Sequence, residues 1–84
     1  MTESDKRRRR LLYRATHRGT HETDLLVGGF VARHLVTLTE ADLTQLEAIL
    51  EYPDVDLAEW LTGRQPIPAD EPHPLLRRMR AEAG

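Results

Sequence analysis

Apolar residues recur every three or four positions along most of the chain, and no stretch alternates strictly between apolar and polar residues. The first pattern is typical of amphipathic helices, the second of strands. The sequence therefore predicts helices at residues 6–17, 23–35, 40–52, 57–62 and 74–83. Together they favour an all-α fold, a small five-helix bundle. Residues 1–5 are expected to form a disordered tail and residues 6–84 a single helical domain.

Glycines mark two special positions in the first half of the chain. Gly19 follows the apolar stripe of Leu11 and Ala15, and because glycine readily takes a positive φ, we expect it to end the first helix. Gly28 and Gly29 instead lie inside the second helix, where each costs about 1 kcal/mol relative to alanine. A neighbouring segment that packs closely against them would account for this cost, and we expect a bend there.

Capping residues mark the ends of the later helices. Thr39, with Asp42 three positions later, forms a capping-box pattern. Asp56, with Glu59 in the same spacing, is expected to cap the next helix, and Gly63 to end it. Four prolines in the eleven residues that follow predict an extended loop before the last helix.

The predicted core is thin and rich in leucine. Only 39% of the 84 residues are hydrophobic, and a domain of this size buries about 60–65% of the surface of its unfolded chain. The apolar faces of the last three helices carry Leu43, Leu46, Ile49, Leu50, Leu57, Trp60, Leu61, Leu75, Leu76 and Met79. We expect Trp60 to lie in this core and to be the main anchor of the acidic half of the chain. Such a core leaves no room for a deep enclosed active site.

Cysteine usage and hydropathy bear on the compartment. The chain has no cysteine, which excludes disulfides, a thiolate zinc site and a cysteine nucleophile. Its longest apolar stretches fall far short of the roughly 20 residues that cross a bilayer, and no apolar region follows the basic start. We therefore expect a soluble, cytoplasmic protein without a secretion signal.

Charge is distributed unevenly although the net charge is only −2. Residues 1–18 hold seven Lys and Arg against two acids, and residues 19–72 hold two against eleven. The run Lys6–Arg10 is the best argument for a nucleic-acid partner, because clustered cations release counterions from phosphate backbones. Basic helix faces also serve as solvated surfaces or docking sites for acidic partners, and these alternatives stay open.

Metal and catalytic sites receive little support. His17, His21 and Glu22 have a spacing that would suit a metal only on a continuous helix, and Gly19 interrupts it. The abundant acids have explanations as helix starts; they include Asp42, Asp56, Glu59 and Glu71. We therefore predict no catalytic residues, no metal and no stably bound cofactor, and a protein that is not an enzyme.

The segment "HRGTHETD" concentrates particular residue types at the corner between the first two helices. Arg18 complements the negative end of the first helix dipole, and Gly19 suits the turn. Glu22 and Asp24 fall in the first turn of the next helix, where acids meet exposed N–H groups. These structural roles explain the residue types without requiring these particular residues.

This corner and a second motif, "ILEYPDVDLAEWLTG", carry a resemblance to a known family. The chain resembles the succinate dehydrogenase assembly factor 2 family, the small flavinylation factors, which share an R-G-x-x-E corner, a capped D-L pair and a W-L pair. The match covers about Arg18 to Gly63, and the combination at this separation is specific. The chain departs from the family at Thr20 and Thr23, where larger apolar residues are usual, and in its heavier basic run.

The resemblance implies a five-helix bundle that acts as an assembly chaperone. It would bind the flavoprotein subunit of succinate dehydrogenase or fumarate reductase and promote covalent attachment of FAD, while a histidine of that subunit attacks the flavin. Arg18 and Gly19 would be the contact pair, Glu22 their companion carboxylate, and Asp24 a helix-start residue with a rim contact. We expect Arg18 to project its guanidinium towards the partner. A nucleic-acid-binding or antitoxin-type regulator is the alternative, since relatives of this family have been described as antitoxins.

Overall fold

The computed structural model describes residues 1–83, and these are mainly helical. The elements are α1 (Glu3–Thr16), α2 (His21–Thr23), the π-helical turn η1 (Asp24–Gly28), α3 (Gly29–His34), α4 (Glu40–Ile49), α5 (Asp54–Thr62) and α6 (Pro74–Ala83). Because α2, η1 and α3 follow one another without a break, they form one continuous helix. The prediction of an all-α bundle with five helices is confirmed, and the described residues contain no strand.

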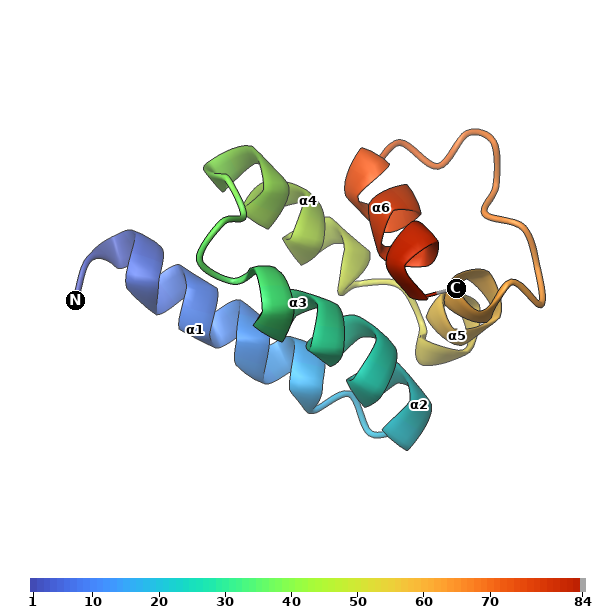
Figure 1. Ribbon diagram of the computed structural model, residues 1–84, viewed down its shortest axis with the longest axis horizontal. Helices are drawn as coiled ribbons and strands as arrows, with labels where there is room; N and C mark the ends of the chain where they lie inside the picture. The colour runs from blue at the N-terminus through green and yellow to red at the C-terminus, as the bar shows by residue number, and fades with distance from the viewer. Residues whose placement is uncertain (84) are drawn as a thin grey trace.

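The first two helices form an antiparallel pair (Figure 1). α1 packs along η1 and α3, and α4 contacts both α1 and α6. α5 contacts both α6 and α2, so it closes the end of the bundle where the chain turns from α1 into α2. The corner predicted to be functional therefore lies beside the start of α5. None of the described helices is long and apolar enough to cross a bilayer.

The first helix begins earlier than the sequence analysis predicted. Thr2 accepts a hydrogen bond from the backbone N–H of Asp5 at 3.0 Å, and the Asp5 carboxylate accepts one from the N–H of Thr2 at 3.3 Å. This capping box starts α1 at Glu3, so residues 3–5 are helical and the expected disordered tail is wrong there. The apolar pattern missed this turn because its side chains are polar.

Close helix packing explains the glycine pair in the second helix. A Cβ added to Gly28 would lie 2.7 Å from Cγ2 of Thr16 and 3.0 Å from the carbonyl oxygen of Ala15. The absence of a side chain therefore lets this helix approach the backbone of α1. The expected irregularity takes the form of the π turn, which ends at Gly28.

We predict opposite stability effects for alanine at the two neighbouring glycines. Gly28→Ala should lower the free energy of unfolding by about 1–3 kcal/mol, because the new methyl group meets the α1 backbone. Gly29→Ala should raise it by about 0.5–1 kcal/mol through better helix propensity, since its Cβ would meet only the flexible end of Arg33, at 3.3 Å. Urea denaturation of both variants checks this, and changes of the same sign would contradict the packing argument.

Two of the later capping predictions differ in outcome. The capping box of Thr39 and Asp42 is present as predicted. The prediction that Asp56 caps α5 is wrong, because the helix begins at Asp54 directly after Pro53, and Asp56 lies within its first turn. Gly63 ends α5 as predicted, with a φ of +80°.

The core is built mainly from leucines, and the second helix contributes Val27, Phe30 and Val31 to it. Its members are Leu11, Ala15, Val27, Phe30, Val31, Leu38, Leu43, Leu46, Ile49, Leu50, Leu57, Leu61, Leu75, Leu76 and Met79. Trp60 is only partly buried and packs edge-to-face on Tyr52, with ring centroids 5.1 Å apart. The prediction that Trp60 is the main anchor of the acidic half is therefore wrong, and among the described aromatic residues Phe30 is the one that is fully buried.

Candidate partner-binding corner

The candidate site is the corner of residues 17–24, which joins α1 to α2. Gly19 adopts a φ of +100°, which an L-amino acid side chain disfavours, so the chain can reverse direction here. Thr20 then caps α2, because its hydroxyl accepts from the N–H of Thr23 at 3.3 Å. Local backbone requirements thus account for the glycine and for Thr20.

The guanidinium of Arg18 points into the protein and closes the corner onto the junction between α4 and α5. Its Nε donates to Oδ1 of Asp54 at 2.5 Å. Its Nη1 and Nη2 donate to the carbonyl oxygens of Leu50 and Tyr52, at 2.8 and 2.7 Å. These carbonyls follow the end of α4, where helix geometry leaves acceptors without partners. The side chain is 11% exposed, so the expectation that its fork projects towards a partner is wrong.

Asp24 fixes the other side of the corner. Its Oδ1 accepts a hydrogen bond from the backbone N–H of Arg18 at 2.7 Å. The carboxylate at the start of η1 thus binds, across the turn, the residue directly before Gly19. Asp24 and Arg18 together hold the corner in one shape, and the rim contact expected for Asp24 stays a prediction.

Gly19 and Glu22 form the accessible part of the corner. Both residues are exposed, and no atom lies within 4 Å of the position that a Cβ on Gly19 would take. Glu22 accepts from Nη2 of Arg64 at 2.8 Å, and Arg64 also approaches Glu59 at 3.6 Å. The hydrogen bond that Arg64 donates to Glu22 raises the pKa of Arg64. The four residues that the sequence predicted at this corner do lie there. Arg18 and Asp24 are partly buried, whereas Gly19 and Glu22 are exposed.

A buried polar cluster around Glu71, which the sequence analysis did not predict, is linked to the corner through Tyr52. The side chain of Glu71 is 3% exposed and accepts from the hydroxyl of Tyr52 at 3.0 Å. It also contacts Nδ1 of His73 at 2.5 Å and Nη1 of Arg77 at 3.4 Å. Burial, and then the hydrogen bond to Glu71, raises the pKa of Tyr52.

The cluster corrects one prediction and links the proline-rich loop to the corner. Glu71 was expected at a solvated helix start, whereas it lies buried before α6. The same Tyr52 whose hydroxyl binds Glu71 offers its carbonyl oxygen to Arg18. No local signal could have revealed this, because Tyr52 and Glu71 are 19 positions apart.

The basic run of α1 is largely neutralised within the protein. Arg7 pairs with Glu40 at 3.3 Å and binds Glu47 even more closely. Arg8 donates to the carbonyl oxygen of Leu35 at 2.6 Å and lies 3.4 Å from Glu40. These contacts join α1 to α4 and to the residue that follows α3, so much of the run has a structural role.

Histidines take part in packing and in contacts with carboxylates. His17 stacks on Tyr13, with ring centroids 4.0 Å apart, and His34 Nε2 lies 2.7 Å from Oε1 of Glu82. This contact lowers the pKa of Glu82. Within residues 1–83, no group of three or more His, Asp or Glu side chains is placed to hold a metal ion.

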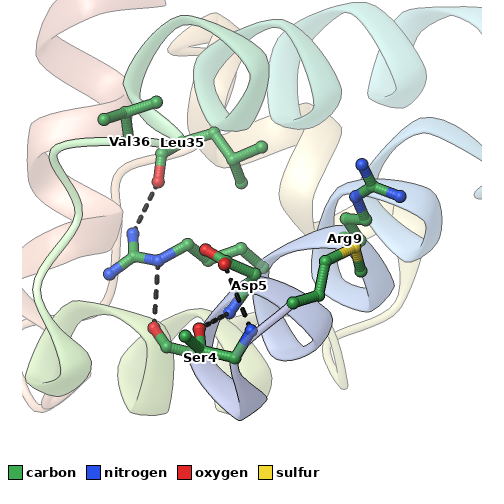
Figure 2. Close-up of a pocket in the computed structure, with 8 residues that line it drawn as sticks. Ser4, Asp5, Arg9, Leu35 and Val36 are labelled. Atoms are coloured by element: carbon green, nitrogen blue, oxygen red, sulfur yellow. Dashed lines mark hydrogen bonds between the residues drawn. The ribbon is translucent and has the colours of Figure 1, made fainter.

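A cavity of about 500 Å³ lies at the opposite end of α1 from the corner. Figure 2 shows Ser4, Asp5 and Arg9 on one side of it and Leu35 and Val36 on the other. Several of its polar groups are engaged: Arg8 donates to Ser4 and to the carbonyl oxygen of Leu35, and Asp5 takes part in the cap of α1. The Ser4 hydroxyl also donates to Oε2 of Glu40 at 2.7 Å, a bond that joins α1 to the start of α4.

Comparisons with known proteins agree with the sequence motifs. The family model described as flavinator of succinate dehydrogenase matches residues 9–83. The chain is 56% identical over 73 residues to the FAD assembly factor SdhE of Acetobacter pasteurianus, which covers 87% of this chain and 67% of that protein. Mitochondrial succinate dehydrogenase assembly factor 2 is 44% identical over 64 residues in Mycosarcoma maydis and 42% over 67 residues in Candida glabrata. The aligned part is 76% of this chain in both cases, but only 27% and 44% of the two mitochondrial proteins. With nearly its whole described length matched, the chain belongs to the flavinator of succinate dehydrogenase family.

Proposed function

We propose that this protein is an assembly factor that binds the flavoprotein subunit of succinate dehydrogenase or fumarate reductase and promotes covalent attachment of FAD. The match of residues 9–83 to the flavinator family carries the proposal. The name of the Acetobacter relative, an FAD assembly factor, supports it. We place this action in the cytoplasm.

The corner is the part of the surface that we assign to the flavoprotein. Gly19 and Glu22 contact the partner, while Arg18 and Asp24 hold the corner in its shape from inside. A corner tied down by hydrogen bonds on both sides loses little freedom when it binds, which favours affinity. The bare backbone at Gly19 lets the partner approach closely.

In this proposal the protein makes no covalent bond itself and keeps no FAD. A histidine of the flavoprotein attacks the flavin, and the assembly factor holds that subunit in a competent arrangement. The carboxylates of the corner serve shape and contact: Asp24 accepts from Arg18, and Glu22 pairs with Arg64. Such structural and contact roles, without a catalytic one, are what we expect of an assembly chaperone.

The nucleic-acid alternative is weaker in light of the ion pairs. Lys6, Arg7 and Arg8 are three of the five cations in the basic run, and each contacts an acid of the same chain. Cations paired in this way release fewer counterions from a phosphate backbone than free ones.

Deletion of the gene tests the proposed function. Without the protein, the flavoprotein band on a denaturing gel should lose most of its flavin fluorescence under ultraviolet light, because less FAD is covalently bound. Reintroduction of the wild-type gene should restore it. Undiminished fluorescence in the deletion strain would contradict the proposal.

A further inference from the structure

One face of α1 points away from the bundle and is both cationic and aromatic. Leu11 and Ala15 on the opposite face are buried in the core. The outward face carries Lys6, Arg9, Arg10, Tyr13 and His17, which are all exposed. At the helical spacing of three and four residues these side chains form one ridge, which runs along α1 to the corner.

Arg9 and Arg10 differ from the other cations of this helix. Arg7, Arg8 and Arg14 reach acids on or next to α4, and Lys6 pairs with Glu3 on its own helix. Arg9 and Arg10 make no ion pair and no side-chain hydrogen bond with any residue of the described chain. The fold therefore does not use these two guanidiniums.

The aromatic pair next to them is also unused by the core. Tyr13 is 65% exposed and stacks on His17. The two stacked rings hold each other in place, so a flat aromatic surface is exposed beside the guanidiniums of Arg9 and Arg10. His17 is the residue directly before Arg18, which makes this ridge continuous with the accessible corner at Gly19.

We propose that this face of α1 is a second half of the docking surface and binds an acidic segment of the same flavoprotein that contacts the corner. The inference rests on the proposed function. Guanidinium forks bind carboxylates with paired hydrogen bonds, and the exposed tyrosine ring supplies apolar contact. Unpaired charges at the edge of an interface also speed association.

Charge distribution favours an acidic protein segment over nucleic acid as the occupant. The whole chain has a net charge of −2, and residues 19–72 hold eleven acids against two Lys and Arg. This excess of acidic residues disfavours an extended phosphate backbone, which carries a charge at every nucleotide. A short acidic segment of the partner that lies along α1 would contact only the cationic ridge.

The test compares Arg9→Gln and Arg10→Gln, singly and together, with Arg33→Gln as the control. Arg33 is an exposed cation on α3 whose pair with Glu82 is long, at 3.6 Å. Binding of each full-length variant to the purified flavoprotein subunit is measured at 20 and 300 mM salt. We expect the double variant to bind about tenfold more weakly at low salt, mainly through slower association, and the difference to shrink at high salt. Arg33→Gln should stay within about twofold of wild type.

The outcomes separate this inference from the proposed function. If wild type binds the flavoprotein and the double variant binds equally well at low salt, the cationic ridge is not part of the interface and only this inference falls. If wild type fails to bind and gene deletion leaves FAD attachment intact, both fall. If the double variant loses binding to duplex DNA but not to the flavoprotein, the ridge binds nucleic acid and the inference is wrong. Thermal unfolding of the double variant should match wild type, since neither arginine has a partner in the fold.

Discussion

Gly19→Arg should abolish covalent FAD attachment while leaving the helical fold in place. Nothing lies within 4 Å of the position of a Cβ on Gly19, so the new side chain projects outward from the accessible corner. A partner seated on that backbone would meet a long charged side chain. We expect the affinity for the flavoprotein to fall by roughly 100-fold or more, about 2.7 kcal/mol.

Gly19→Ala is the matched control, because it separates backbone strain from bulk. Any L-residue at a φ of +100° is strained, at a cost of about 1–2 kcal/mol, and both variants share this cost. Alanine adds only a methyl group and should keep most of the binding. Far-ultraviolet circular dichroism of both variants should stay helical, and binding is read by isothermal titration. Equal losses in both variants would point to strain, and unchanged binding of Gly19→Arg would refute the contact at this corner.

Arg18→Met should cost about 3 kcal/mol of stability, a large share of what a small domain has. The variant leaves the carboxylate of Asp54 and the carbonyl oxygens of Leu50 and Tyr52 without their donors. Since Arg18 is 11% exposed and Asp54 28%, water replaces these bonds only in part. The melting temperature should fall by roughly 10–20 °C.

Arg10→Met is the control for this stability measurement. Arg10 lies on the same helix and is exposed, so its replacement should change the free energy of unfolding by less than about 0.5 kcal/mol. Urea denaturation of the two variants, together with Asp54→Asn and the double variant, gives the coupling between Arg18 and Asp54. If Arg18→Met were as stable as Arg10→Met, the guanidinium would not hold the junction of α4 and α5.

Arg18 shows where sequence reasoning about the site succeeded and where it failed. The motif placed Arg18, Gly19, Glu22 and Asp24 at one corner, and the structure brings them together there. The direction of the Arg18 side chain was wrong, because its acceptors lie 32 to 36 positions further along the chain. Which of the four residues contact the partner stays part of our proposal.

The sequence by itself determined the features that depend on neighbours within about four residues. Apolar spacing gave the helices, Thr39 and Gly63 marked helix ends, and the family was recognisable from two short motifs. Tertiary structure decided the rest. It paired the basic run with the acids of α4, buried Glu71 behind Tyr52, and turned Arg18 inward. The physical reason is that helix formation and capping are local, whereas the partner of a charged side chain depends on which distant segments the packed core brings together.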